Sequence, residues 1–451
     1  MKIRAIIFFT LLTLSLLLSA CGTLEINVQT PTARPTLFPS PTPVQVIDTP
    51  FANATPSRQA PTSGPGPTPA PTTAPANDPH LKAGLALNLI RTAMVSETSG
   101  WAVGTVYGDL RQHVLFTSDG GLTWKDRTPV QALAASPATA LGAVTAFFND
   151  NVAWAVFYDI VPQPNPAPLV VYHTSDGGAT WSLGAALDLN GVTVEFETPS
   201  DLGFVDEQNG WIMVHVGAGM MHDYFAGFNT TDGGQTWNRF IDPSTQTPIM
   251  SCPKSGLAFT SPTSGWITGN CPGLMPQLFI FHSADSGGNW ASAILPVPTG
   301  KPAGYFGQSS IACGIPAINF AAGNTVLLTL ACENTNNNTA QSWLYASSDD
   351  GDTWTQHPLP MPYGNLSMLG PEEGFLVGSQ STALDADGAI YHSSDSGSTW
   401  SQLTSTAWTG LPDFVDDHTG WVIAVHNDKT AYVHTLDGGR TWSEIKPVTG
   451  D

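Results

Sequence analysis

Thr117-Ser118-Asp119-Gly120-Gly121-Leu122-Thr123-Trp124 is the stretch that decides the fold, because six further copies of it follow along the chain. The copies run from Thr174 to Trp181, Thr230 to Trp237, Ser283 to Trp290, Ser347 to Trp354, Ser393 to Trp400 and Thr435 to Trp442. The common pattern is [Ser/Thr]-x-Asp-x-Gly-x-Thr-Trp, with Asn289 in place of the Thr in the fourth copy. Successive Asp residues lie 42 to 64 residues apart, a period that indicates an array of one repeated β unit.

The residue types of the repeat predict a tight turn between two strands. A carboxylate at the Asp position can accept hydrogen bonds from nearby backbone N–H groups, and glycine supplies the positive φ that such turns need. A short apolar run such as 113–116 precedes the turn and the Trp begins the next strand, which is the pattern of a β-hairpin. We therefore assign a structural role to the seven Asp–Trp pairs: Asp119, Trp124, Asp176, Trp181, Asp232, Trp237, Asp285, Trp290, Asp349, Trp354, Asp395, Trp400, Asp437 and Trp442.

A second signature precedes most of these copies. It reads Gly-Trp-x-x-Gly or a close variant, as in 100–104 and 265–269, with Gly374-Phe375 in the sixth unit. The repeated octet resembles the Asp-box, or bacterial neuraminidase repeat, and its pairing with Gly-Trp resembles the photosystem II assembly factor-like propellers within the sialidase-like superfamily. The resemblance covers about residues 86 to 447 and implies a propeller fold. It implies little about function, because sialidases, xyloglucanases and sortilin-type receptors share the box.

The repeats predict an all-β fold: a single seven-bladed β-propeller with Asp-box turns over residues 81–451. In the first blade the expected strands are 89–95, 101–106, 113–116 and 124–127. The strand order begins with the innermost strand and ends with the outermost, so no exchanged strand is expected where the ring closes. Closure of the ring protects the sheet edges from unwanted pairing.

The first twenty residues predict a lipoprotein signal peptide. Lys2 and Arg4 precede an apolar run from Ile6 to Leu18 that is short for a membrane span. The run ends in Leu18-Ser19-Ala20-Cys21, which resembles a bacterial lipobox and implies lipidation of Cys21; an ordinary secretory signal with a chance Cys is the alternative. Attachment by several acyl chains would be stable. The expected location is the bacterial cell membrane, lipid-anchored and exposed on the extracytoplasmic side.

Residues 21–80 have the composition of a disordered, lipid-anchored linker. Fourteen prolines lie between Pro31 and Pro79, among Thr, Ser, Ala and Gly. Such a segment buries too little apolar surface to offset the entropy of ordering. We interpret it as a Pro/Thr-rich stalk, with recognition of its proline segments as the alternative.

Four cysteines remain after Cys21, and three pairings of them are possible. The repeat register favours Cys252 with Cys271 and Cys313 with Cys332, because each pair is separated by 19 residues and lies at the same position of its blade. Disulfides suit an exported protein. Neither pair has the Cys-x-x-Cys spacing of a zinc or redox site.

The charge balance disfavours nucleic acid as a partner. Fifteen Lys and Arg face 36 Asp and Glu, which gives a net charge of −21. Such a chain repels phosphate backbones. The membrane is expected as a partner only through the lipid anchor.

Ligand contacts are expected on the face opposite the Asp turns, where the connections between second and third strands gather. Insertions there are expected at 158–168, 215–227, 270–277, 333–341 and 379–388. Long loops on one rim are a common place for a binding site. The candidate contacts are Tyr107, Tyr158, His222 and Tyr224, with Asn270, Met220, Met221 and Asn336; solvated loop tips without a ligand are the alternative.

Enzymatic function is open, and the sequence leans against it. A sialidase needs three converging arginines, and residues 81–451 contain only Arg91, Arg111, Arg127, Arg239 and Arg440. A glycoside hydrolase with two loop carboxylates remains the alternative. Its candidates are Asp109, Asp159, Glu195, Glu197, Asp201 and Asp223, each of which has solvated surface as its simpler interpretation.

No metal or cofactor is expected. His173, His282, His392 and His434 all precede the Ser or Thr of a repeat, so they belong to four different blades and indicate a packing or hydrogen-bonding role. Residues 385–388 resemble part of a calcium loop but lack its downstream Glu. The expected function is that of a surface-tethered, non-catalytic propeller that binds or scaffolds a protein or glycan partner at the cell envelope.

Overall fold

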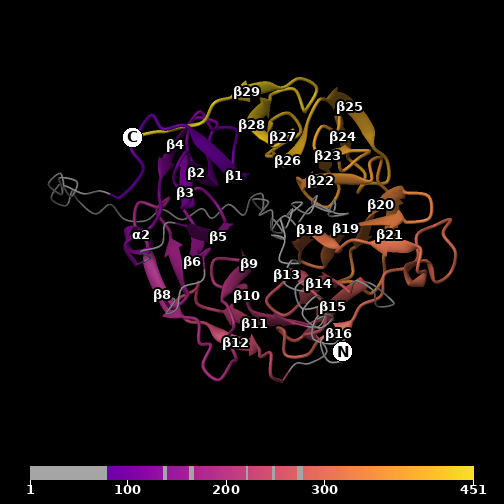
Figure 1. The fold of residues 1–451 in the computed structure, drawn as a ribbon, viewed down its shortest axis with the longest axis horizontal. Coiled ribbons are helices and arrows are strands. Elements are labelled where there is room, and N and C mark those ends of the chain that lie inside the picture. Colours follow the sequence, from indigo (N-terminus) through magenta and orange to yellow (C-terminus); the bar gives the residue numbers. More distant parts are fainter. Residues whose placement is uncertain (1–78, 136–139, 162–166, 220–221, 246–248, 272–277) are drawn as a thin grey trace, which may run out of the picture. The chain divides into compact units, whose positions relative to one another are not determined.

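The computed structural model describes residues 79–451, except 136–139, 162–166, 220–221, 246–248 and 272–277. All described residues belong to one compact unit. The strands form seven sheets that follow one another around a ring in sequence order (Figure 1). The predicted all-β, seven-bladed propeller is therefore confirmed.

Each blade is a meander whose strands pair with their neighbours in sequence. Blade 1 contains β1 (Leu87–Met94), β2 (Gly100–Val106), β3 (His113–Thr117) and β4 (Thr123–Asp126). Blade 2 contains β5 (Leu141–Phe147), β6 (Ala153–Asp159), β7 (Val170–Thr174) and β8 (Ser182–Ala186). Blade 3 contains β9 (Thr198–Phe204), β10 (Gly210–Gly219), β11 (His222–Thr230) and β12 (Asn238–Ile241). Blade 4 contains β13 (Lys254–Phe259), β14 (Gly265–Asn270), β15 (Leu278–Ser283) and β16 (Ala291–Ser292).

The remaining blades keep this order, with one interruption in blade 5. There β17 (Ile311–Cys313) and β18 (Ala317–Ala322) both pair with β19 (Thr325–Asn334), followed by β20 (Thr339–Ser347) and β21 (Thr355–Pro358). Blade 6 contains β22 (Tyr363–Met368), β23 (Gly374–Ser379), β24 (Gly388–Ser393) and β25 (Ser401–Thr406). Blade 7 contains β26 (Thr409–Phe414), β27 (Gly420–His426), β28 (Lys429–Thr435) and β29 (Ser443–Ile445). Short helices in the described connections include α2 (Val130–Ala135) after β4 and η2 (Tyr305–Gly307) before β17.

The meander gives the ring two different faces. In an antiparallel blade the turns after the first and third strands lie at one end, and the connections after the second and fourth strands lie at the other. The seven Asp-containing turns follow the third strand of each blade and therefore share one face, named here the turn face. The other face, named here the loop face, carries the connection between second and third strands in every blade.

Aromatic residues of the second strands pack the blades together. Trp101, Trp154, Trp211, Trp266 and Trp421 are each at most 2% exposed. The indole of Trp154 donates to the Gly233 carbonyl at 2.8 Å, and that of Trp211 donates to the Leu257 carbonyl at 2.8 Å. Each of these bonds reaches the next blade, so one side chain supplies both a large buried area and a polar link.

The chain end closes the ring through a strand that we did not predict. After β29 the chain forms β30 (Val448–Thr449), which pairs in parallel with β4 on the outer edge of blade 1. Thr449 is 2% exposed, and its backbone N–H donates to the Leu85 carbonyl at 2.9 Å. Blades 1 and 7 each still contain four strands of their own, so β30 is an addition and no strand is exchanged.

Two of the expected loop insertions are extended strands instead. In blade 3, β10 and β11 continue to Gly219 and His222, so most of the segment expected as a loop at 215–227 is paired. In blade 5, β19 and β20 pair as far as Asn334 and Thr339, which includes most of 333–341. Continued cross-strand hydrogen bonding explains the difference, because a long hairpin satisfies backbone groups that a loop of equal length would leave to water.

Both predicted disulfides are present. Cys252 bonds to Cys271 and Cys313 bonds to Cys332, and in each pair the two residues are 19 apart in sequence. Cys252 precedes β13 and Cys271 follows β14, while Cys313 and Cys332 are register partners on β17 and β19. Both bridges therefore lie toward the loop face of adjacent blades.

Candidate functional site

The seven turn carboxylates each accept hydrogen bonds from their own turn. In the first, Asp119 Oδ1 accepts from the Thr123 backbone N–H at 2.9 Å, and its Oδ2 accepts from the Thr123 hydroxyl at 2.6 Å. The hydroxyl of Thr117 donates to the same carboxylate at 2.8 Å. Equivalent bonds recur at the other six: Asp176, Asp232, Asp285, Asp349, Asp395 and Asp437. With their oxygens occupied in seven separate sheets, these groups are poorly placed for a shared reaction.

The four histidines that precede the turns stack on the aromatic residue of the second strand. The ring centroids of Trp154 and His173 are 5.0 Å apart, those of Trp266 and His282 4.4 Å, and those of Trp421 and His434 5.0 Å. The pair Phe375 and His392 repeats the contact at 4.7 Å with a more tilted geometry. The packing role that the repeat predicted for these histidines is confirmed.

The four predicted ligand contacts lie at the loop-face ends of their strands, on three blades. Tyr107 follows β2 and is fully exposed, while Tyr158 near the end of β6 is half-buried with its ring over Gly142. Burial raises the pKa of the Tyr158 hydroxyl. His222 and Tyr224 alternate on β11, and their rings stack with centroids 5.7 Å apart and planes 12° from parallel. The structure therefore brings only His222 and Tyr224 together.

Other predicted contacts differ in outcome. Asn270 is buried, and its amide donates to the Cys313 carbonyl, so it links blades 4 and 5. Asn336 is exposed in the turn after β19. Met220 and Met221 lie outside the described residues. So do Cys21, at which lipidation is expected, the expected signal peptide and all but the end of the expected linker.

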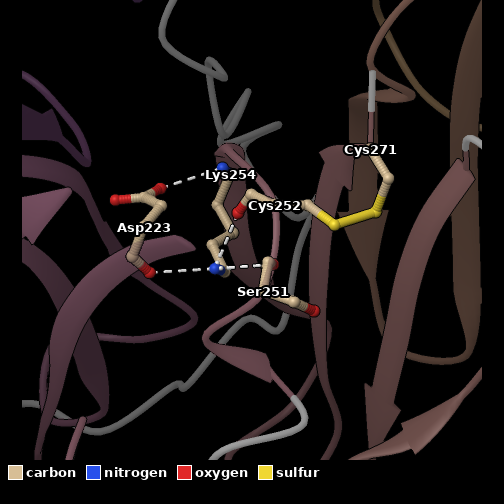
Figure 2. The surroundings of a disulfide bond; sticks show 5 residues. All are labelled: Asp223, Ser251, Cys252, Lys254 and Cys271. Carbon is tan, nitrogen blue, oxygen red and sulfur yellow. Dashed lines mark hydrogen bonds between the residues drawn. A yellow bond between two sulfur atoms is a disulfide. The ribbon is translucent and has the colours of Figure 1, made fainter. Parts of the chain in front are cut away.

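Lys254 joins blades 3 and 4 beside a disulfide (Figure 2). Its side chain is buried, and its Nζ donates to the carbonyls of Asp223 at 2.9 Å, Ser251 at 2.9 Å and Cys252 at 2.8 Å. The rings of Phe225 and Phe279 each lie 5.3 Å from Nζ. Burial lowers the pKa of Lys254 to about 7, and the charge of Asp223 opposes that shift. Three carbonyls around Nζ match the three N–H bonds of an ammonium group.

A chain of polar side chains continues from Lys254 into the inner strands of blade 3. The Lys254 backbone N–H donates to Asp223 Oδ2 at 2.9 Å, and Asp223 Oδ1 lies 2.8 Å from His215 Nδ1. The other ring nitrogen of His215, Nε2, lies 3.2 Å from Ser200 Oγ, and that hydroxyl lies 2.8 Å from Asp201 Oδ2. Asp201 and Asp223 are buried, whereas Ser200 and His215 retain partial exposure.

The pKa values of the two carboxylates in this network, Asp201 and Asp223, are shifted in opposite directions. Burial raises the pKa of Asp201. Burial also acts to raise the pKa of Asp223, but hydrogen bonds and charge from His215 and Lys254 outweigh it and lower the pKa. Opposed shifts in neighbouring acids are typical of sites that separate acid from base roles.

The remaining carboxylate candidates do not join this cluster. Asp109 forms an ion pair with Arg111, in which Arg111 Nη2 lies 2.6 Å from Asp109 Oδ2. Asp159 ends β6 in blade 2. Glu195 is exposed and Glu197 is half-buried, both just before β9, and burial raises the pKa of Glu197. Of the six expected carboxylates, the structure brings Asp201 and Asp223 into one network.

Sequence reasoning missed Ser200, His215 and Lys254. It selected acidic groups and exposed loops, but these three residues lie on strands that come together only through the pairing of β9, β10 and β11 and the packing of blade 4. A signal was present in the spacing of His215 and Asp223. If the hairpin turn is placed at 219–222, both residues fall near its end and within reach of each other.

The arginines of the described chain are spread over separate contacts. Arg91 donates to the Thr145 carbonyl at 2.7 Å, Arg239 to the Asp188 carbonyl at 2.7 Å, and Arg440 to the Asp437 carbonyl at 2.6 Å. Arg111 is paired with Asp109, and Arg127 follows β4. This distribution does not provide the three converging guanidinium groups of a sialidase.

Among the described residues, one group has donor atoms close enough to hold a metal ion: Asp416, Asp417 and His418, in the turn between β26 and β27. Two of the three are exposed, and all three belong to one turn on the turn face. Within the same described part of the chain, no helix has the length and hydropathy needed to cross a membrane.

No protein-family model matches the sequence, and neither does any curated protein. Solved structures with a similar fold include YCF48 bound to D1 peptide, at 15% identity and a TM-score of 0.47 over 81% of this chain and 99% of that chain. Another is the GH74 xyloglucanase from Xanthomonas campestris, at 11% identity and a TM-score of 0.48 over 82% of this chain and 55% of that chain. The arabinanase of Penicillium chrysogenum complexed with arabinobiose is a third, at 12% identity and a TM-score of 0.39 over 67% and 93%. At these identities the likeness concerns the propeller fold alone.

Proposed function

We propose that this chain is a membrane-tethered Asp-box propeller that binds a protein or glycan partner through its loop face. One observation carries the binding proposal. Six of the fourteen exposed large apolar side chains among the described residues lie in or next to the connections between second and third strands of four blades; they are Tyr107, Leu110, Ile160, Val161, Tyr224 and Leu384. Exposed apolar groups arranged on one rim are typical of an interaction surface.

The residue types on the loop face support a peptide or a glycan as the binding partner. Aromatic rings at partial exposure contribute large contact areas at low entropic cost, and tyrosine adds a hydroxyl for hydrogen bonding. The net charge of −21 disfavours polyanionic partners. The stacked pair His222 and Tyr224 presents a flat apolar surface beside polar edges.

A binding assay with paired variants tests this proposal. The full-length protein in detergent is screened on a glycan array and on an unbiased peptide library, and the strongest ligand is titrated by calorimetry. We expect Tyr224→Ala or Tyr107→Ala to weaken binding about tenfold or more, in the range of an interface anchor. Leu436→Ala is the control, because Leu436 is 67% exposed on the turn face. Equal losses from both faces, or the absence of any ligand, would overturn the proposal.

The tether is tested separately. The apolar run ending at Cys21 motivates it, and we expect wild-type protein to sediment with membranes after cell lysis. Cys21→Ser should prevent lipidation and reduce the membrane-associated share, and mass spectrometry of the N-terminal peptide reports the acyl chains directly. An unmodified Cys21 in membrane-bound protein would contradict the lipoprotein assignment.

A glycoside hydrolase with two carboxylates receives less support. Asp201 and Asp223 are the carboxylates that the structure brings together, and both are buried and hydrogen-bonded to protein groups. A glycosidic bond needs open space between its acid and its base or nucleophile. Turnover of a chromogenic glycoside that is lost in Asp159→Asn or Glu197→Gln would nevertheless establish it.

A further inference from the structure

Blade 3 carries a feature that goes beyond ligand binding: a serine, a histidine and an aspartate in consecutive contact. Ser200 lies on β9, His215 on β10 and Asp223 on β11, so three adjacent strands position them. Ser200 Oγ is 3.2 Å from His215 Nε2, and His215 Nδ1 is 2.8 Å from Asp223 Oδ1. We propose that Ser200 is the nucleophile of an acyl-transfer site, with His215 as its general base and Asp223 as the residue that orients the imidazole.

The order of atoms supports this assignment. A serine hydroxyl becomes a nucleophile when a neutral imidazole can accept its proton, which requires the free lone pair on the nitrogen that faces it. Asp223 Oδ1 accepts a hydrogen bond from the Nδ1–H of His215, which keeps the ring proton on Nδ1 and leaves the lone pair of Nε2 directed at Ser200. Asp223 is itself held by the Lys254 backbone N–H at 2.9 Å. Blade 4 thus holds Asp223 through Lys254, and Asp223 in turn holds the imidazole of His215 in place.

Asp201 completes the hydrogen-bonding of the serine. A hydroxyl has one hydrogen, and Ser200 Oγ lies within hydrogen-bonding distance of both Asp201 Oδ2 and His215 Nε2. Burial raises the pKa of Asp201. The ionised carboxylate accepts the hydroxyl hydrogen of Ser200, whereas the protonated carboxyl can donate to Ser200 Oγ and leave the serine hydrogen for His215. We assign the nucleophilic form of Ser200 to the state in which Asp201 is protonated.

The backbone at this point is unusual in a way that fits a built site. Asp201 has a φ of 47°, a left-handed conformation that is costly for residues other than glycine. The register of β9 against β10 shifts here, between the pairs Trp211 with Gly203 and Met213 with Ser200. Bulges of this kind re-aim side chains beside functional sites. The bulge in β9 lets the side chains of the consecutive residues Ser200 and Asp201 form a hydrogen bond with each other.

The reaction is the transfer of an acyl group from a carboxylic ester. Ser200 Oγ attacks the carbonyl carbon and its proton passes to His215 Nε2; the bond to the alkoxy group then breaks, and His215 returns the proton to the departing alcohol. Water repeats these steps on the Ser200 ester, which releases the carboxylic acid and restores the serine. Neutral or cationic esters are the favoured substrates, because Asp223 and the nearby Glu195 and Glu197 disfavour anions.

A second serine–histidine pair in the same ring provides a matched control. Ser264 Oγ lies 2.9 Å from His282 Nε2 near the turn face of blade 4. The carboxylate of Asp350 approaches that same Nε2 atom at 3.3 Å and accepts from Ser264 at 2.6 Å. The carboxylate thus competes for the nitrogen that would act as base, and the ring is stacked on Trp266. Ser264 should therefore remain unreactive.

The test is covalent labelling of the full-length protein. A fluorophosphonate probe reacts with activated serines, and peptide mass spectrometry identifies the modified residue. We expect the label on Ser200, its loss in Ser200→Ala, and an unchanged rate in Ser264→Ala. Hydrolysis of p-nitrophenyl acetate should fall about a hundredfold or more in Ser200→Ala, the usual range for loss of proton-transfer or nucleophilic groups.

Asp223→Asn separates positioning from folding. Its amide oxygen can accept from the Lys254 N–H, while its NH₂ group donates to His215 Nδ1 and moves the ring proton to Nε2. We expect the variant to fold, with a Tm lowered by loss of the Asp223 charge beside Lys254 but still well above the assay temperature. Labelling should slow about a hundredfold or more, with a changed pH–rate profile. A probe that labels other serines and leaves Ser200 untouched would overturn the proposal, as would unchanged labelling in Asp223→Asn.

Discussion

At the scale of single residues, the contact between blades 3 and 4 depends on buried polar groups. Lys254 is 6% exposed, and its ammonium nitrogen is surrounded by three carbonyl oxygens and two aromatic rings. A buried cation is costly unless it is compensated, and here the three N–H bonds of the ammonium group are satisfied by carbonyls while the Asp223 charge lies nearby. Its partner Asp223 also holds His215, so the same lysine supports the serine cluster of blade 3.

We therefore expect Lys254→Met to destabilise the protein by about 2 to 4 kcal/mol, because three buried carbonyls lose their donor and the Asp223 carboxylate loses the positive charge beside it. Lys254→Arg should not restore stability, since a planar guanidinium does not match three converging carbonyls. Urea unfolding followed by tryptophan fluorescence measures the change. Lys301→Met is the control: its Nζ also lies over two rings, Tyr305 and Trp343, but its side chain is only partly buried. Equal effects of the two variants would contradict this account.

Elements were easier to predict than contacts. The local pattern around Asp119 already contains the groups that the turn needs, so its position could be predicted without knowledge of the rest of the chain. The cluster of Ser200, His215, Asp223 and Lys254 spans 54 residues of sequence, counted as 254 − 200, and forms only through strand register and blade packing. The extended hairpin of β10 and β11 was missed for the same reason: polar, glycine-containing segments are typical of loops, and only cross-strand pairing distinguishes them.

At the scale of the element, the second residue after each turn Asp shows what the repeat requires. The second residue after each Asp is glycine in all seven turns, with φ between 74° and 89°. A Cβ at Gly351 would lie 2.2 Å from the ring of Trp266, so space as well as conformation demands glycine there. The first residue after the Asp is less constrained: Ser286, Asp350 and Ser396 occupy it with φ of 62°, 58° and 59°.

Ser396→Gly should consequently stabilise the domain. It relieves a left-handed conformation that costs roughly 1 kcal/mol, although the greater freedom of glycine in the unfolded chain offsets part of that gain. The expected result is a small rise in Tm, measured by differential scanning calorimetry. Gly397→Ser, one residue later, should lower Tm strongly, because a Cβ there would lie 2.4 Å from Leu344. A lower Tm for Ser396→Gly would show that its side chain contributes contacts that outweigh the strain.

The turn carboxylates also predict how stability depends on pH. Hydrogen bonds from the Thr399 side chain and backbone lower the pKa of Asp395 to about 2, and those from Thr441 do the same for Asp437. A carboxyl whose pKa is lower in the folded state stabilises it when ionised, so this contribution is present above about pH 4 and is lost as the pH falls toward 2. We expect Tm to decline over that window, and to decline less steeply in Asp395→Asn. A parallel pH dependence of the variant and the wild type would contradict the assignment.

At the scale of the whole molecule, stability depends on how the ring is closed. β30 lies between β4 and the segment that precedes β1, where the Leu85 N–H donates to Thr449 Oγ1 at 2.8 Å and Thr449 Oγ1 donates to the Lys82 carbonyl at 2.6 Å. The repeats predicted the ring, but two residues of β30 carry too little pattern to predict a strand. The Met94 N–H also donates to Asp413 at 2.9 Å, so blades 7 and 1 are linked near the inner strands as well.

Thr449→Val tests the closure at nearly constant shape. The variant leaves the Leu85 N–H and the Lys82 carbonyl without their partner, which should cost about 1 to 3 kcal/mol. Deletion of 448–451 should lower Tm further and make native-state hydrogen exchange faster in β4 and β1. Thr404→Val, on the partly exposed β25 of blade 6, is the control. An unchanged exchange rate in β4 after the deletion would show that the blades hold the ring without this strand.

The pairing of the two ends on blade 1 also has a mechanical consequence. A pulling force applied at the N-terminal side of residue 80 first meets the hydrogen bonds of His80 to the Thr128 carbonyl and of the Leu81 N–H to Asp126. It then meets the bonds of residues 82–85 to Thr449, and all of these lie before β1. Those bonds would carry the load first, and their rupture would free both ends of the chain while the disulfides of blades 4 and 5 still prevent full extension. Under tension the propeller is therefore expected to open first where its two chain ends meet on blade 1. Optical tweezers can resolve this small first extension from the later unfolding of the blades.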